Sequence, residues 1–380
     1  MNRTDALASW RDADLFDPPE VYGRQEREGG LTACYYAGLP WRGKETRVFA
    51  LMGLPAGAGP DAPVPGMVLV HGGGGTAFPD WVQHWNELGF AAISMDCCGC
   101  KGGGTHADRP RHAMGGPPGW GGFDQLDEPI EDQWMLHAIA AGVRGHSLLR
   151  SLPEVDESRV GLTGISWGGI QASTMAGLDD RFRFVIPVYG CGFISDYGSG
   201  PGKFAEMGEA ASRQWVETWD PSNYLPDAAQ PMLWVNGTND VAFSLLSMML
   251  SYKLPSGPGT LSFHYRLPHG HKEGWAPREI DAFAAHHCLG GEPLVRIVEQ
   301  DRDESGIRLE YESIIPVVKA ERFHTTGSGP WREREWERTT LGLGVGEVWA
   351  ENPPGATGCF INLIDERGLT VSSEMVDTRR

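Results

Sequence analysis

The sequence is short of basic residues, of cysteines and of long apolar segments. Its 32 lysine and arginine residues are outnumbered by 50 aspartates and glutamates, which gives a net charge of −18. An acidic chain is poorly suited to a phosphate backbone or an anionic membrane surface, so we expect neither nucleic acid nor membrane as a partner. Its apolar runs fall well short of the roughly 18 residues that a membrane-spanning helix needs.

Cysteine is also scarce, with seven residues of which three are crowded together at Cys97, Cys98 and Cys100. An odd number suits a reducing compartment better than a disulfide framework. The first sixteen residues lack the basic start and apolar core of a signal peptide, so we expect a cytoplasmic protein. A fourth ligand beside the three cysteines is not evident, and we expect no metal and no cofactor.

Glycine and proline are plentiful, at 52 and 27 residues, and predict many loops between the regular elements. Between about residues 31 and 291, short runs rich in Val, Ile and Leu alternate with helical patterns. Such runs are typical of strands buried on both faces, and the alternation predicts an α/β fold with a mostly parallel central sheet. The expected strands are 67–70, 90–95, 159–164, 182–188, 231–235 and 261–267, preceded by a hairpin within 31–55.

Beyond residue 291 the pattern changes to strand-like segments separated by turns, which predicts a small all-β, sandwich-like domain over 292–380. The polar residues 1–30 are expected to form an N-terminal arm. The catalytic domain would then be 31–291. Two long connections within it, 97–126 and 190–227, are interpreted as lid loops over a binding site.

Ser166 stands in the sequence Gly-Ile-Ser-Trp-Gly-Gly, directly after a predicted strand and before a helical pattern. A serine on a tight strand-to-helix turn needs tiny neighbours two residues away on either side, and the turn presents its hydroxyl clear of the sheet. The pattern alone is weak evidence, but its position between strand and helix favours a nucleophile.

The sequence His71-Gly-Gly-Gly-Gly follows the predicted strand at 67–70. Successive glycines free the backbone to direct N–H groups at one point, as an oxyanion hole requires. We expect those donors among Gly72, Gly73 and Gly74, together with the N–H of Trp167. A phosphate-binding loop is disfavoured, because the Lys-Ser/Thr ending of a P-loop is missing.

A serine nucleophile needs a base, and the base needs an acid to orient it. Asp240 follows the predicted strand 231–235, and a Pro-His-Gly-His sequence follows the strand 261–267. Both groups would lie at the edge of the sheet where Ser166 lies. We favour His271 as the base, since the preceding glycine lets the loop turn inwards, and keep His269 as the alternative.

Four motifs together resemble the α/β-hydrolase superfamily: HGGGG at 71–75, GISWGG at 164–169, NGTND at 236–240 and PHGHKEGW at 268–275. Within it, the chain is similar to the branch of acetyl xylan esterases, dienelactone hydrolases and prolyl oligopeptidases. The resemblance covers about 31–290 and implies attack by Ser166, base catalysis by His271 oriented by Asp240, and an acyl-enzyme. The all-β C-terminal part is no part of the minimal fold.

The resemblance favours a small-molecule ester or an acylated sugar as substrate, and an acetyl esterase as the activity. A serine exopeptidase with the same triad is the alternative, and would need acids to anchor an amino terminus, for which Asp124, Asp127 and Glu128 are candidates. A non-hydrolytic binding protein is a third hypothesis. We expect the C-terminal part to support the hydrolase domain structurally, with a carbohydrate-binding module as the alternative. The oligomeric state is not predicted.

Substrate-pocket candidates come mainly from the two lids. Aromatic rings there suit a sugar or aryl group but are more often lid packing, and the arginines would clamp a carboxylate unless they are merely solvated. The candidates are His71, Arg109, Arg111, Trp120, Phe193 and Trp215, with His106 and Tyr197 also on the lids.

Overall fold

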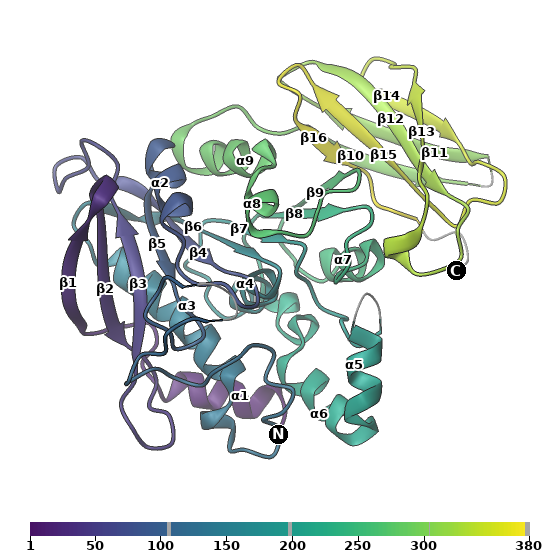
Figure 1. Cartoon of the computed structure of the whole chain (residues 1–380). Coiled ribbons are helices and arrows are strands. Elements are labelled where there is room, and N and C mark those ends of the chain that lie inside the picture. The colour runs from purple at the N-terminus through teal and green to yellow at the C-terminus, as the bar shows by residue number, and fades with distance from the viewer. Residues whose placement is uncertain (105–107, 197–199, 304, 377–380) are drawn as a thin grey trace.

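The computed structural model describes residues 1–104, 108–196, 200–303 and 305–376. Thirteen strands in these ranges form one mixed sheet in the order β1-β2-β3-β5-β4-β6-β7-β8-β9-β16-β15-β12-β13, and β10-β11-β14 form a second. Figure 1 shows the first sheet running through the molecule from the N-terminal edge to the C-terminal unit. The strands are β1 (Val21–Arg27), β2 (Leu31–Ala37), β3 (Arg47–Gly53), β4 (Val64–Val70), β5 (Ala91–Met95), β6 (Val155–Ile165), β7 (Val185–Val188), β8 (Met232–Gly237), β9 (Gly259–His264), β10 (Arg296–Arg302), β11 (Gly306–Glu312), β12 (Val317–Thr325), β13 (Glu337–Leu341), β14 (Glu347–Glu351), β15 (Gly358–Asp365) and β16 (Thr370–Ser372).

The middle of the large sheet is parallel from β5 to β9, and the α/β fold predicted from the strand-helix alternation is confirmed. Val68 on β4 pairs with Ile93 on one side and Leu162 on the other. All residues of β5, β7 and β8 are buried, because helices cover both faces of these strands. This is why their sequences are continuous apolar runs rather than alternating ones.

The helices pack on both faces of the sheet, with α2 and α9 above it and α3 and α4 below it in the view of Figure 1. His84 Nε2 of α2 lies 2.9 Å from Asp281 Oδ1 of α9, which joins the two upper helices. Within the described ranges, none of the helices has the length and apolarity that crossing a bilayer requires. The helices are α1 (Arg3–Arg11), α2 (Pro79–Glu87), α3 (Trp134–Arg150), α4 (Trp167–Ala176), α5 (Gly200–Met207), α6 (Glu209–Trp219), α7 (Leu245–Tyr252), α8 (His271–Trp275) and α9 (Arg278–Leu289), with short 3₁₀ turns η1 (Glu28–Gly30), η2 (Ile130–Asp132), η3 (Pro221–Asn223), η4 (Leu225–Asp227) and η5 (Trp331–Glu333).

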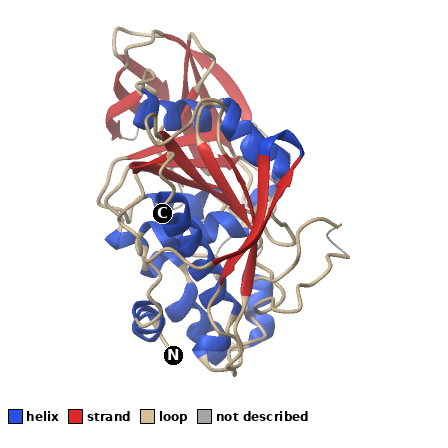
Figure 2. Cartoon of the chain, turned by 90° about the vertical axis from the view of Figure 1, so that its left-hand side faces the viewer, coloured by secondary structure: helices blue, strands red, loops and turns tan. Residues whose placement is uncertain are grey.

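The N-terminal residues are more ordered than an arm. They form α1, which is capped by the side chain of Asn2, and β1, which pairs antiparallel with β2. Trp10 is buried and its indole N–H donates to the carbonyl of Leu136 on α3. Figure 2, seen from this edge, shows the twist of the strands with helices on both sides. The hairpin predicted within 31–55 is present as β2 and β3.

The two predicted lid loops differ. The described part of 97–126 contains no helix or strand, whereas 190–227 holds α5, α6 and two 3₁₀ turns, so its interpretation as a loop is wrong. The missed signal is the spacing of Trp215, Thr218 and Trp219, which form the buried stripe of α6. The indole N–H of Trp215 donates to the carbonyl of Gly121 at 2.7 Å, so the two segments are joined to each other.

The strands predicted beyond residue 291 are present and form two layers, β16-β15-β12-β13 and β10-β11-β14. The first layer continues the large sheet, since Ser372 of β16 pairs antiparallel with Leu261 of β9. The N–H of Phe263 also donates to Ser372 Oγ at 2.7 Å, and the amide of Asn362 donates to the carbonyl of Phe263 at 3.0 Å. The C-terminal unit is therefore joined to the α/β part by strand pairing and by side-chain hydrogen bonds to the backbone of β9.

Candidate active site

Ser166 occupies the turn between β6 and α4 with φ 58° and ψ −117°. A serine at positive φ carries backbone strain of about 1–3 kcal/mol, which persists only where the surroundings impose it. The surroundings here are too close for any side chain. A Cβ on Gly164 would overlap the carbonyl of Gly168, and one on Gly168 would overlap the carbonyl of Val70. The two glycines of the motif are thus steric requirements of the turn that presents the Ser166 hydroxyl.

A histidine joins this hydroxyl to a carboxylate, and it is His269. Its Nε2 lies 2.9 Å from Ser166 Oγ, and its Nδ1 lies 2.7 Å from Asp240 Oδ2. Ser166 follows β6, Asp240 follows β8 and His269 follows β9, so neighbouring strand ends bring the three groups together. The preference for His271 is therefore corrected in favour of the alternative.

The environment of His271 explains the correction. Gly270 is extended, with φ −155° and ψ 162°, and caps α8, so His271 is carried into the first turn of that helix. Its ring packs 3.9 Å from the ring of Phe78 and 4.8 Å from that of Trp81, measured between centroids. Burial, with smaller effects of His71 and Arg109, lowers the pKa of His271 to about 3. His271 is thus a neutral ring on the apolar side of the cavity.

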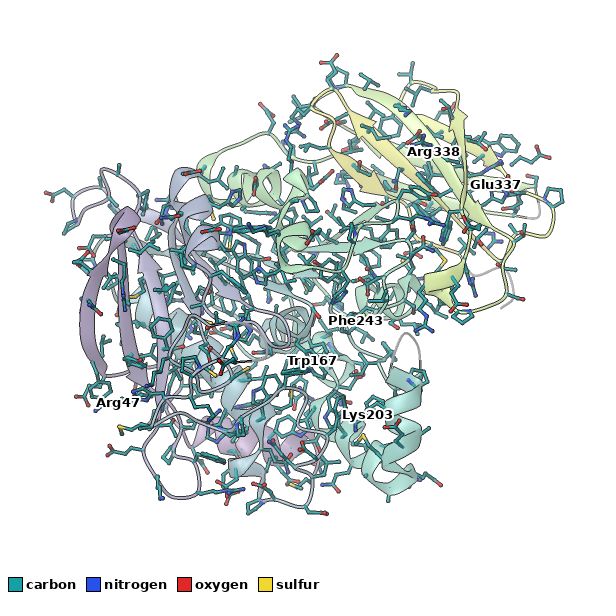
Figure 3. The ribbon with its side chains drawn as sticks, viewed as in Figure 1. Arg47, Trp167, Lys203, Phe243, Glu337 and Arg338 are labelled. Atoms are coloured by element: carbon teal, nitrogen blue, oxygen red, sulfur yellow. The ribbon has the colours of Figure 1, made fainter. Side chains whose placement is uncertain are left out.

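Asp240 is held by its own loop. Its Oδ1 accepts the backbone N–H groups of Ala242 at 2.8 Å and Phe243 at 2.7 Å, which leaves Oδ2 for His269. The residue is buried at 4% exposure. Phe243 and Trp167, which flank the acid and the serine in sequence, are both labelled near the middle of the molecule in Figure 3. Such an anchored acid fixes the orientation of the imidazole.

Tyr189 also contacts the histidine and was not anticipated from the sequence. Its ring lies 4.4 Å from that of His269, and its hydroxyl donates to the carbonyl of Gly270. Burial raises the pKa of Tyr189 well above its usual value, so the hydroxyl remains a neutral donor. The signal in the sequence was only its place at the end of a predicted strand. Tyr189 therefore fixes the loop that carries His269.

A cavity of about 300 Å³ opens at Ser166. Gly72 approaches the serine so closely that a Cβ on it would lie 3.2 Å from Ser166 Cβ, and a Cβ on Gly73 would lie 2.7 Å from Trp167 Cδ1. The glycines therefore let the backbone reach the place where an oxyanion would form, as the predicted hole requires. The lining residues are Gly72, Gly73, Gly74, Gly75, Phe78, Arg109, Ile165, Ser166, Tyr189, His269, Gly270 and His271.

His71 supports this glycine loop from beneath and does not line the cavity. Its Nε2 accepts the N–H of Cys97 at 2.9 Å, and its Nδ1 donates to the carbonyl of Gly72 at 2.7 Å. Burial lowers the pKa of His71, in keeping with a neutral ring whose two nitrogens are both engaged. His71 is thus a structural residue rather than the pocket residue that the sequence suggested.

Three potential metal ligands, on His71, Asp96 and Cys98, lie within 4.8 Å of one another. Hydrogen bonds account for this cluster. Asp96 accepts the hydroxyl of Thr76 and the N–H groups of Cys98 and Cys100, each at 2.7–2.9 Å, while His71 is engaged as described. The cysteine-rich turn is therefore held by a buried carboxylate, and all seven cysteines are free, buried thiols.

The other pocket candidates divide. Arg109 lines the cavity, and its Nε donates to the carbonyl of Gly74 at 2.9 Å. Trp120 is 43% exposed and lies beside Gly73. Three other candidates, Arg111, Phe193 and Trp215, do not line the cavity. The guanidinium of Arg111 donates to the carbonyls of Cys98 and Gly116, and the backbone N–H of Phe193 donates to Asp220. The ring of Trp215 is buried against those of Phe123 and Phe204. His106 and Tyr197 lie outside the described residues.

The acids considered for an amino-terminus anchor are not in the cavity. Asp124 and Asp127 are exposed, and Glu128 pairs with Arg42 at 3.0 Å. None of the described residues that line the cavity is an aspartate or a glutamate. The lining does include the positively charged guanidinium of Arg109.

Comparisons with known proteins bear on the family and the fold of the chain. The family model described as acetyl xylan esterase (AXE1) matches residues 24–204. The acetyl xylan esterase from Paenibacillus sp. R4 is 22% identical, with a TM-score of 0.58 over 71% of this chain and 91% of that one. Acetyl xylan esterase 1 from Thermoanaerobacterium sp. JW/SL YS485 is 18% identical, with a TM-score of 0.58 over 75% and 94%. At these identities the two structures establish the fold. No curated protein matches.

Proposed function

We propose that the chain, an α/β hydrolase whose residues 24–204 match the acetyl xylan esterase (AXE1) family model, removes small acyl groups, acetyl foremost, from a hydroxylated substrate such as a sugar. The observation that carries the proposal is the hydrogen-bonded series Ser166–His269–Asp240, with the serine in the lining of a glycine-rich cavity.

In the proposed reaction, Ser166 Oγ attacks the ester carbonyl carbon while His269 Nε2 takes the hydroxyl proton. Backbone N–H groups among Gly72–Gly74 and Trp167 stabilise the negative oxygen of the tetrahedral intermediate. As the intermediate collapses, His269 returns the proton to the leaving alcohol and the acyl group stays on Ser166. Water then attacks the acyl-enzyme with His269 again as base, which releases the carboxylic acid and restores the serine. Asp240 stabilises the imidazolium that forms in each half of the reaction.

The cavity favours an ester over a peptide substrate. At about 300 Å³ it lies at the small end of ligand pockets, which suits a short acyl group. An exopeptidase would need an acid to bind the substrate amino group. The described residues that line the cavity include the guanidinium of Arg109 instead, and its positive charge would repel the substrate amino group.

The proposal is tested by labelling the protein with a fluorophosphonate and mapping the modified peptide, alongside a panel of p-nitrophenyl acyl esters, aminoacyl-p-nitroanilides and acetylated xylo-oligosaccharides. We expect the adduct on Ser166, and acetyl ester hydrolysis at rates at least about tenfold above those of longer acyl chains, because each misfitting contact costs 1–3 kcal/mol. A folded protein that is not labelled, or that cleaves only the anilides, would refute the proposal.

A further inference from the structure

The loop that carries Asp240 is held by the C-terminal unit. Asn239, the residue before the acid, directs its amide at a segment ninety-five residues further along the chain. Asn239 Nδ2 lies 2.7 Å from the carbonyl oxygen of Arg334, 3.2 Å from that of Arg332 and 3.4 Å from that of Trp331. These carbonyls belong to residues 329–336, between β12 and β13, which we name the buttress segment.

The loop that carries His269 is tied to the same place. Arg266, three residues before His269, has a positive φ of 50°, and its N–H donates to Thr238 Oγ1 at 3.0 Å. The Thr238 hydroxyl in turn donates to Asn239 Oδ1 at 2.8 Å. The guanidinium of Arg266 also contacts both carboxylate oxygens of Glu335, at 2.7 and 2.8 Å. The acid loop, the histidine loop and the buttress segment therefore form one hydrogen-bonded assembly.

The buttress segment is itself well fixed. Arg334 is buried at 4% exposure, and its guanidinium lies 3.6 Å over the ring of Trp331. Its Nε donates to the carbonyl of Gly329 at 3.0 Å. Trp331 in turn stacks against Trp336, whose side chain is buried. A segment closed in this way presents its carbonyls at defined positions, which is what a support for another loop requires.

We infer that the C-terminal unit is a structural part of the active site, with Asn239 as a positioning residue through which the buttress segment sets the loop of Asp240 and thereby the orientation of His269. The inference rests on the proposed triad. Its physical basis is that displacements of about 1 Å in a catalytic group cost up to 10²-fold in rate. The unit then has a role in catalysis without contacting the substrate.

The test compares two asparagines that both join the C-terminal unit to the α/β part. Asn239→Asp keeps the shape of the side chain but removes the N–H donors and faces carbonyl oxygens with a carboxylate. Asn362→Ala, the matched control, removes the bonds to the carbonyl of Phe263 on β9 and to the hydroxyl of Ser372 on β16, which lie at the sheet junction and not in the buttress segment. We expect N239D to lower kcat about tenfold or more with KM changed less than threefold. N362A should lower Tm and leave kcat within twofold of wild type.

The outcomes separate the inference from the proposed function. N239D with wild-type kcat, or N362A with an equal loss of kcat, would overturn the inference while fluorophosphonate labelling of wild type keeps the esterase proposal intact. An unlabelled wild type would overturn both. If N239D does not fold, Glu335→Arg tests the same assembly from the exposed surface, since Glu335 is 82% exposed. A lower kcat at constant KM then supports the inference, and a wild-type kcat refutes it.

Discussion

Two histidines that line opposite parts of the candidate active site, His269 and His271, are two residues apart in the sequence, yet their surroundings differ in chemistry. On one side His269 lies between a hydroxyl and a carboxylate. On the other side, two residues later, His271 packs among the rings of Phe78, Trp81 and Trp275, and its Nε2 is buried without a hydrogen-bond partner among the described residues. The first environment supports proton transfer, and the second holds the imidazole neutral.

The difference shows that the local backbone, rather than residue type, decides the role of each histidine. His269 stays in the loop after β9, where Tyr189 fixes the following carbonyl. His271 is the first residue of α8 and is turned towards α2. Each prediction below either breaks one side of the cavity or sharpens the contrast between the two sides.

The largest effect is expected from Ser166→Ala, which removes the proposed nucleophile. We expect kcat to fall by about 10³-fold or more, because the members of a triad act as one unit. The measurement is ester hydrolysis, with circular dichroism to show an unchanged fold. Retention of more than a tenth of the wild-type rate would show that another group attacks the ester.

The next comparison sets His269→Ala against His271→Phe. Loss of His269 removes the proposed base, and kcat should fall by about 10³-fold or more. Phenylalanine at 271 keeps an aromatic ring against Phe78 and Trp81, so kcat should remain within about tenfold of wild type. Steady-state kinetics of both variants decide the matter. The reverse order of effects would return the base to His271.

Arg109 offers a smaller effect on substrate choice. If Arg109 binds a substrate carboxylate, as the sequence predicted, Arg109→Gln should lower kcat/KM more for a carboxylate-bearing ester than for a neutral ester of equal size. We expect the difference to be about tenfold, because hydrogen bonds to charged groups contribute about 1.5–3 kcal/mol. Arg111→Gln is the matched control, because Arg111 does not line the cavity. Equal losses on both esters would assign Arg109 to holding the carbonyl of Gly74.

The last prediction concerns stability against pH and no change in activity. The folded state holds the pKa of His271 at about 3, whereas the unfolded chain titrates near 6.5, so below pH 6.5 only the unfolded state takes up this proton. The free energy of unfolding should therefore fall by about 1 kcal/mol per pH unit between pH 6 and pH 4 through this group. Urea unfolding of wild type and His271→Phe measures it. Equal pH slopes in the two proteins would contradict the buried, neutral ring.

Sequence reasoning located the serine and the acid because both follow buried strands, and the ends of neighbouring parallel strands lie together. It did not distinguish the two histidines. Their surroundings depend on where α8 begins, and the glycine between them does not reveal that the helix begins at His271. The sequence also did not predict the strand β1 or the pairing of β9 with β16. Such pairings join residues far apart in sequence, and Leu261 carries no mark of its contact with Ser372.

The continuous sheet has a consequence for self-association of this protein through the edges of its sheet. The strand β9 would otherwise leave its hydrogen-bonding groups open to another chain, but β16 covers that edge. The outermost strands are instead β1 and β13, whose residues are mostly exposed and include Arg24, Glu26, Glu337 and Arg338. Figure 3 labels the last two on the C-terminal sheet. Charged side chains on an edge discourage further strand pairing. The C-terminal unit thus moves this edge of the sheet from β9 to the charged strand β13, where further strand pairing is disfavoured.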